Sequence, residues 1–238
     1  MFGIFKKKDK PPYISAVIAA GGSSSRMQGE NKLLAEIGGL PVLAHTLLAF
    51  ESNSNISEIV ISAKEDMLLT YADIAKTFDI SKATHVIAGG STRAESVYKG
   101  VCAANPKADY ILVHDAARPL ISDDVINRVI NGMKDHGCAA AAVAVKDTLR
   151  IFEASENGYR ILPRDDVKAM QTPQGADRHL LAAALQNCVV NNISVTDDCA
   201  ALELLGAKPF FVEGSYKNIK ITTNEDLVIA EAFLMEEI

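Results

Sequence analysis

Cysteine is scarce in this sequence, with four residues among 238. Cys102, Cys138, Cys188 and Cys199 are separated by 36, 50 and 11 positions. These spacings match neither a set of zinc ligands nor the disulfide framework of a small secreted protein. We therefore expect four free thiols in a protein of the reducing cytosol.

Positive charge is not in excess, since 24 Lys and Arg residues against 30 Asp and Glu give a net charge of −6. A protein that grips the phosphate backbone of nucleic acid needs a basic surface, so nucleic acid is not an expected partner. No apolar run reaches the roughly 18 to 20 residues of a membrane span. The basic N-terminal tail, residues 1–12, has prolines where a signal peptide has its apolar core. We expect a solvated tail on a cytoplasmic protein, with an electrostatic contact to a membrane surface as the alternative.

Several catalytic motifs are also missing. The sequence contains no G-x-S-x-G, H-E-x-x-H or C-x-x-C, which removes the usual basis for a serine hydrolase, a zincin or a thioredoxin. It contains neither G-x-x-x-x-G-K-[ST] nor G-x-G-x-x-G. The interpretation of this protein as a P-loop kinase or a nicotinamide dehydrogenase therefore lacks its main sequence evidence.

The composition is that of a globular protein, with 48% hydrophobic and 23% charged residues. Apolar, β-branched runs alternate with helix-like segments, which predicts an α/β fold: a Rossmann-like, open, mostly parallel sheet with helices on both faces. Residues 13–238 are expected to form one domain, with a protruding β-hairpin arm over about 146–171 around Glu-Asn-Gly. The predicted strands are 13–20, 56–63, 84–90, 109–116, 138–145 and 209–213, and the predicted helices are 40–50, 65–78, 91–104, 123–135, 177–191, 196–205 and 224–237.

The first strand is followed by a Gly/Ser-rich turn, GGSSSRMQGENK. In an open α/β sheet, ligands bind beyond the carboxyl ends of the strands. Gly21, Gly22 and Ser23 would let backbone N–H groups approach phosphate oxygens, and Arg26 and Lys32 would supply positive charge. The alternative is a flexible connection without a ligand.

Two further turns lie at the same predicted edge. GGSTRAES carries Gly89, Arg93 and Ser96, which suggests a second backbone approach to one flat ligand, although a plain helix N-cap is the alternative. VHDAARP carries Asp115, a candidate for holding Mg²⁺, since this ion prefers one or two carboxylates plus phosphate oxygens. A structural ion pair between Asp115 and Arg118 is the alternative. His114, which alternates with Asp115, is expected to face the core.

Polar residues late in the chain, in the segments LPRDD, MQTPQ, VTDD and NIKITT, are by themselves only loop residues. A sheet edge with cationic phosphate loops and one carboxylate suits phosphoryl or nucleotidyl transfer, which depends on positioning and charge neutralisation and not on a protein nucleophile.

The segments AAGGSSSRMQGENK, GGSTRAESVYKG, VHDAARPLIS, KDTLR, MQTPQ, VTDDCAALE and NIKITTNEDL resemble, in this order, the 2-C-methyl-D-erythritol 4-phosphate cytidylyltransferases of the non-mevalonate isoprenoid pathway. The resemblance runs from about Tyr13 to the C-terminus. It implies a fold of the nucleotide-diphospho-sugar transferase type and transfer of CMP from CTP to a polyol phosphate, with Mg²⁺. Ribitol 5-phosphate cytidylyltransferases are close relatives and remain an alternative. A nucleotide-binding regulatory module without turnover is a second one.

The resemblance also implies roles for individual residues. Arg26 and Lys32 match the cations that stabilise the charge on the α-phosphate of CTP. Arg164 and Lys220 match the pair that positions the acceptor phosphate. The arm corresponds to a hairpin that clasps a second subunit, which predicts a homodimer. The expected nucleotide-binding positions are Ala20, Gly21, Gly22, Ser23, Gly89, Arg93, Ser96, Asp115, Thr148 and Thr196.

The first loop departs from the family pattern at three positions. Ser24 stands where the family usually has the second glycine of A-A-G-x-G-x-R-M, Asn31 replaces the proline before the lysine, and Leu33 replaces the following glutamine. None of these changes removes a cation, so the expected activity stands.

Overall fold

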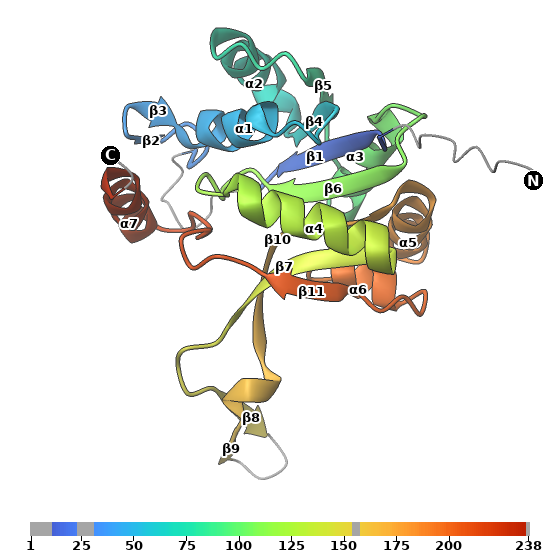
Figure 1. The fold of residues 1–238 in the computed structure, drawn as a ribbon, viewed down its shortest axis with the longest axis vertical. Coiled ribbons are helices and arrows are strands. Elements are labelled where there is room, and N and C mark those ends of the chain that lie inside the picture. Colours follow the sequence, from blue (N-terminus) through green and yellow to red (C-terminus); the bar gives the residue numbers. More distant parts are fainter. Residues whose placement is uncertain (1–10, 23–30, 154–157, 237–238) are drawn as a thin grey trace, which may run out of the picture.

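The computed structural model describes residues 11–22, 31–153 and 158–236. Its centre is a seven-stranded sheet in which β10 runs antiparallel to both of its neighbours and the other pairs are parallel (Figure 1). This confirms the expected mostly parallel α/β sheet. The strands, in their order across the sheet, are β11 (Phe210–Glu213), β7 (Cys138–Ala144), β10 (Lys168–Asp177), β6 (Tyr110–Asp115), β1 (Ile14–Ala20), β4 (Glu58–Ala63) and β5 (Ala83–Ala88).

Helices cover both faces of the sheet. One face packs against α1 (Val42–Ser52), α2 (Leu68–Thr77) and α4 (Asp123–His136). The other packs against α3 (Arg93–Ala103), α5 (Arg178–Val190) and α6 (Asp198–Glu203). The last helix, α7 (Asn224–Met235), contacts a small ribbon formed by β2 (Glu36–Ile37) and β3 (Leu40–Pro41), and a short 3₁₀ turn, η1 (Glu65–Met67), precedes α2.

The continuous apolarity of the first strand has the cause that the sequence indicated. Ile14 and Ile18 of β1 belong to the core under α1 and α2, whereas Val17 between them belongs to the core under α3 and α5. Successive side chains of a strand point to opposite faces, and here both faces are covered, so each of these residues is fully buried. The two cores support the sheet on both faces beneath its carboxyl edge.

The strand β10 was not predicted. The sequence pattern predicts an arm that extends to residue 171, but Lys168 already pairs with Ala144 of β7 inside the main sheet. The segment is polar and contains Pro173, which lacks the N–H that a central strand donates. The register shifts between Met170 and Gln174, so the proline lies where the ladder is interrupted.

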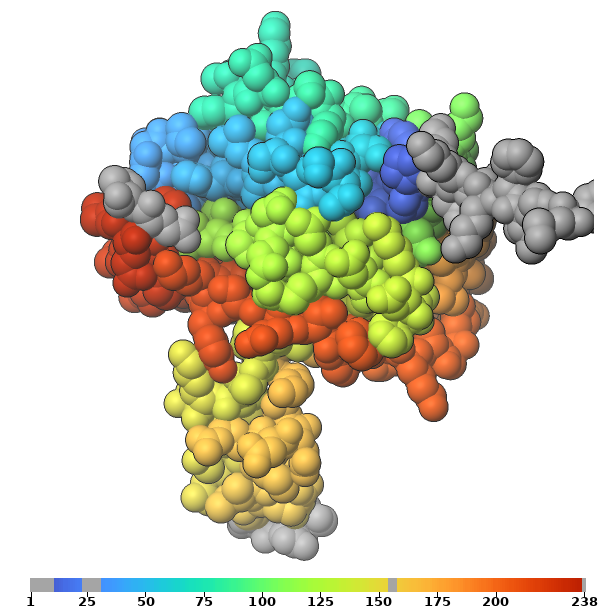
Figure 2. All heavy atoms as spheres, in the orientation of Figure 1, coloured from blue at the N-terminus to red at the C-terminus, as the bar shows by residue number. Residues whose placement is uncertain are grey.

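The arm is a hairpin of β8 (Arg150–Glu153) and β9 (Gly158–Ile161), followed by the 3₁₀ turn η2 (Arg164–Asp166). It projects from the body as a separate lobe (Figures 1 and 2). The predicted hairpin is therefore confirmed, although residues 154–157 at its tip lie outside the described part. All four cysteines are free thiols, and no described helix is long and apolar enough to cross a membrane.

Candidate functional site

A cavity of about 340 Å³ lies at the carboxyl edge of the sheet, where β1 and β6 end. Adjoining it is a second cavity of about 270 Å³, which reaches toward β10 and the N-terminus of α6. Arg93, Asp115 and Lys220 line both. The other residues around the first cavity are Ala19, Ala20, Gly21, Gly22, Lys32, Leu33, Gly90, Ser91, Thr92, Ser96 and Ala117.

Most of the predicted site residues that the structure describes meet at these cavities. Three segments far apart in the sequence bring Lys32, Arg93 and Lys220 to the first cavity, together with the first glycine turn. Thr196 lines the second cavity. Thr148 and Arg164 belong to the arm and line neither cavity, and the Arg164 guanidinium donates a hydrogen bond to the Lys146 carbonyl at 3.2 Å. Ser23 and Arg26 lie outside the described residues.

The second glycine turn is a close approach between β5 and the start of α3. A Cβ atom on Gly89 would lie 2.8 Å from the Ser96 hydroxyl oxygen, too near for any other residue to fit without a shift. The Ser96 hydroxyl accepts a hydrogen bond from the Gly90 N–H at 3.0 Å. Thr92 caps α3 by accepting from the Glu95 N–H at 3.1 Å, so the N-cap alternative is also present. The segment that caps α3 therefore also forms part of the cavity wall, because Thr92 and Ser96 both line the first cavity.

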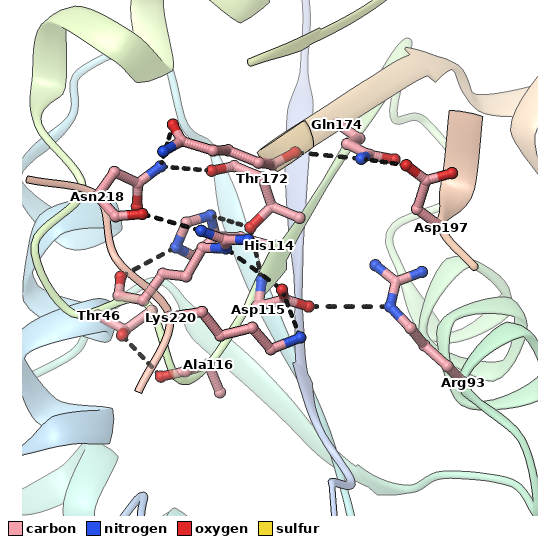
Figure 3. Close-up of polar contacts among 12 residues, drawn as sticks. Thr46, Arg93, His114, Asp115, Ala116, Thr172, Gln174, Asp197, Asn218 and Lys220 are labelled. Atoms are coloured by element: carbon pink, nitrogen blue, oxygen red, sulfur yellow. Dashed lines mark hydrogen bonds and ion pairs between the residues drawn. The ribbon is translucent and has the colours of Figure 1, made fainter. Parts of the chain in front are cut away.

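Asp115 lies at the centre of a cluster of cations (Figure 3). Its Oδ2 atom is 2.9 Å from the Lys220 Nζ and 3.3 Å from the Arg118 Nε, and its Oδ1 atom is 3.8 Å from the Arg93 Nε. Burial alone would raise the pKa of this carboxyl group, but Lys220, Arg93 and Arg118 lower it well below its usual range. Asp115 is therefore ionised. The predicted alternative, an Asp115–Arg118 pair, is present as well.

Arg93 is held in a fixed orientation by Asp198, whose two carboxylate oxygens accept hydrogen bonds from the guanidinium at 2.9 and 2.7 Å. Asp198 is only 1% exposed, and its charge helps raise the pKa of Arg93 above the ordinary value despite burial. A bidentate pair of this kind fixes the plane of the guanidinium. Its Nε edge is thereby turned toward Asp115 (Figure 3).

The sequence pattern does not predict the residues that support this arrangement. Gln174 of β10 donates to the Asp197 carboxylate at 2.9 Å and accepts from the backbone N–H groups of Asp198 and Cys199, both at 3.0 Å. Gln174 thus ties β10 to the first turn of α6. The sequence shows Gln174 only as the second Gln of MQTPQ. Its role depends on β10, a strand that the sequence pattern does not predict.

His114 supports the Asp115 turn from inside the core, as expected from its alternation with Asp115. The Thr172 hydroxyl accepts from the Asp115 N–H at 3.0 Å and contacts the His114 Nδ1 at 3.0 Å, and the His114 Nε2 faces the Arg118 carbonyl at 3.2 Å. Burial lowers the pKa of His114 to about 4, so the ring is neutral. Because Nε2 faces a carbonyl oxygen it must carry the proton, and Nδ1 accepts from Thr172.

The donor set bears on the predicted metal. Within the described ranges, no three His, Cys, Asp or Glu side chains gather into a metal cage. Mg²⁺ does not need such a cage when phosphate oxygens supply the other ligands. The Asp115 Oδ1 atom is 3.8 Å from Arg93, beyond hydrogen-bond distance. This carboxylate oxygen fits the part of one Mg²⁺ ligand, with triphosphate oxygens as the other ligands. Asp115 as a metal ligand stays a prediction.

A parallel sheet edge with glycine turns, three converging cations and one ionised carboxylate defines a class of enzyme that binds a phosphorylated nucleotide and transfers part of it, a nucleotidyltransferase. The comparisons with known proteins agree. Residues 14–236 match the model of the family described as 2-C-methyl-D-erythritol 4-phosphate cytidylyltransferase. The chain belongs to this family.

Relatives with this name cover nearly the whole chain. The one from Halalkalibacterium halodurans is 39% identical over 224 residues, 94% of this chain and 97% of its own length. The one from Clostridium botulinum strain Langeland is 36% identical over 92% of this chain and 96% of its own length. The crystal structure of 4-diphosphocytidyl-2C-methyl-D-erythritol synthase from Anaerococcus prevotii has a TM-score of 0.84 and 32% identity, covering 94% of this chain and 97% of that one.

Proposed function

We propose that this protein transfers CMP from CTP to 2-C-methyl-D-erythritol 4-phosphate, giving 4-diphosphocytidyl-2-C-methyl-D-erythritol and pyrophosphate in the synthesis of isoprenoid precursors. The observation that carries the proposal is the convergence of Lys32, Arg93 and Lys220 with the glycine turns on one cavity. Relatives that are 36 to 39% identical over 92 to 94% of this chain bear the name of this activity. The proposed location is the cytoplasm, in keeping with four free thiols.

The reaction needs positioning and positive charge. A phosphate oxygen of the acceptor attacks the α-phosphorus of CTP, a new P–O bond forms in line, and the bond to the β-phosphate breaks to release pyrophosphate. The attacking oxygen is already an anion, so no general base is required. Lys32, together with Arg26 from the undescribed part of the first loop, would meet the charge that develops on the α-phosphate. The glycine turns would hold the nucleotide by backbone N–H groups.

Magnesium is part of the proposal. When bound, Mg²⁺ would neutralise charge on the triphosphate, and Asp115 is the side chain that would hold it together with phosphate oxygens. Lys220 and Arg93 would then contribute to metal binding as well as to phosphate binding. They lower the pKa of Asp115 and so keep the carboxylate that would hold the ion in its charged form.

The acceptor phosphate would be held by Lys220 and Arg164. Lys220 lines the cavity, but Arg164 lies on the arm and lines neither cavity of its own chain. The arm also exposes a set of apolar side chains, Ile151, Phe152, Tyr159 and Ile161. We infer that the protein is a homodimer in which the arm clasps the second copy and brings Arg164 to the second copy's cavity.

The experiment that tests the proposed function is pyrophosphate release with CTP and Mg²⁺, comparing methylerythritol 4-phosphate with ribitol 5-phosphate as acceptor. Faster turnover with the first is expected. Preference for ribitol 5-phosphate would move the protein to CDP-ribitol synthesis, and CTP binding without turnover would favour the regulatory module. Lys32→Ala should lower turnover by about 10² to 10³, the usual cost of removing one preorganised charge. Near-full activity of Lys32→Ala would contradict the assignment.

A further inference from the structure

The backbone around Lys32 is held by the side chain of the residue before it. Asn31 accepts a hydrogen bond through Oδ1 from the Leu33 N–H at 3.1 Å, and its own carbonyl accepts from the Leu34 N–H at 2.9 Å. Side-chain and backbone bonds thus close the same turn, with Lys32 inside it. Leu33, the next residue, is 4% exposed and packs in the core.

The Asn31 amide is itself anchored to a distant buried residue. Its Nδ2 donates a hydrogen bond to the Tyr71 hydroxyl at 3.0 Å. Tyr71 belongs to α2 and is 1% exposed, and burial raises the pKa of its phenol, so the hydroxyl stays protonated and able to accept. None of the residues that line the cavity comes from α2. Tyr71 therefore lies outside the described wall of the cavity, and its hydrogen bond to Asn31 links it to the turn that carries Lys32.

We propose that Asn31 and Tyr71 are positioning residues that fix the backbone of Lys32, so that its ammonium group lies where charge develops in nucleotidyl transfer. The inference rests on the proposed function. A lysine side chain is a flexible four-carbon stem carrying a point charge, so its placement depends strongly on where its backbone is held. The Asn31 side chain restrains this backbone through two hydrogen bonds, one accepted from the Leu33 N–H and one donated to the Tyr71 hydroxyl.

The chain contains a matched control for this motif. Asn105 accepts from the Lys107 N–H at 3.0 Å and donates through Nδ2 to the Tyr13 hydroxyl at 3.4 Å. The chemistry is the same as at Asn31, but Tyr13 precedes β1 and Asn105 precedes β6, so this pair lies at the amino edge of the sheet, opposite the cavity. Asn105→Ala and Tyr13→Phe remove the same bonds without touching the site.

The test is a double-mutant cycle with Lys32. Turnover and CTP affinity are measured for Asn31→Ala, Tyr71→Phe and Lys32→Ala, for Lys32→Ala combined with each of the other two, and for the two controls. Asn31→Ala should lower kcat/KM about 10-fold and Tyr71→Phe somewhat less, since small misplacements of a catalytic group have effects of this order. The controls should retain wild-type values. Thermal unfolding verifies that each variant is folded.

The decisive result is whether the effects of Asn31→Ala and Tyr71→Phe depend on the presence of Lys32. If Asn31 and Tyr71 act through Lys32, their substitutions should have no further effect once Lys32 is alanine. An equal loss in both backgrounds, or a loss matched by Asn105→Ala, would show a general structural role and overturn the proposal. If the wild-type protein binds CTP without turnover, the proposed function fails, but the same cycle measured on the CTP Kd still decides whether Asn31 positions Lys32.

Discussion

At the scale of single residues, the charged side chains of the site are held by ion pairs in which carboxylates and cations balance each other's charge. Asp115 is ionised because three cations surround it, and Arg93 is oriented because Asp198 holds two of its nitrogens. The two carboxylates are nearly buried, with side chains 11% exposed for Asp115 and 1% for Asp198, and would be costly there alone. The Arg93 side chain is 28% exposed and that of Lys220 is 41% exposed. Lys220 is the cation of this group best able to reach an incoming phosphate.

His114 gives the protein an acid-sensitive stability. Its folded-state pKa of about 4 lies below the ordinary value of 6.5, so the unfolded chain binds the proton first as the pH falls. The free energy of unfolding should therefore decrease from about pH 6.5 down to about pH 4, by up to about 3 kcal/mol. Above pH 6.5 both states are neutral and the contribution is constant.

Urea unfolding of the wild type and of His114→Asn between pH 4 and 7 checks this prediction. The variant should lose much of the slope, whereas His85→Asn, with a half-exposed ring, should keep it. A wild-type slope unchanged by His114→Asn would show that other groups cause the acid sensitivity.

At the scale of elements, the approach of α3 to β1 depends on Gly100. A Cβ atom at this position would lie 2.5 Å from the Val17 Cγ1 atom in the buried core. Gly100→Ala should therefore destabilise the protein by about 1 to 3 kcal/mol, even though alanine favours a helix. Denaturant unfolding measures the loss. Cys102→Ala, on the exposed side of the same helix, should change little, and a stabilised Gly100→Ala variant would mean that α3 moves freely on the sheet.

The arm presents Phe152, Tyr159 and Ile161 on one face of its hairpin, since Phe152 pairs with Tyr159 across the strands. Their side chains are 53%, 68% and 53% exposed, more apolar surface than so small a hairpin would leave in water. The double substitution Phe152→Ser, Ile161→Ser should convert the expected dimer into a monomer in sedimentation experiments. Leu69→Ser removes a side chain that is 83% exposed elsewhere and should leave the dimer intact. A wild-type monomer at micromolar concentration would refute the dimer.

At the scale of the whole molecule, the proposed dimer places residues of two chains in each site. A mixture of Arg164→Ala and Lys32→Ala subunits, refolded together, would then form heterodimers with one intact site and one doubly defective site. With random pairing, about one quarter of the wild-type activity should return although each variant alone is nearly inactive. Pyrophosphate release by the mixture measures it. Activity no greater than that of the separate variants would indicate that Arg164 does not act across the dimer.

The sequence determined the strands that are buried on both faces and the loops that follow them. A segment such as residues 13–20 is apolar throughout because both faces of a central parallel strand are covered, and this signal is local. The glycine turns, Lys32 and Arg93 could be assigned to one edge because parallel strands align their carboxyl ends, whereas Lys220 was assigned to the site only through the resemblance to the family. Asn157 and Gly158 marked the arm because a hairpin turn has its own sequence pattern.

Only the tertiary structure decided how polar residues pair in the interior. The strand β10 reads as a polar segment with a proline, yet Gln174 and Thr172 are buried there because their partners arrive from α6 and β6. No local pattern encodes such partners, since they come from segments distant in the sequence. The same holds for Asn31, whose anchor Tyr71 lies 40 residues away. The sequence determined which residues stand at the sheet edge, and folding decided which of them hold the others in place.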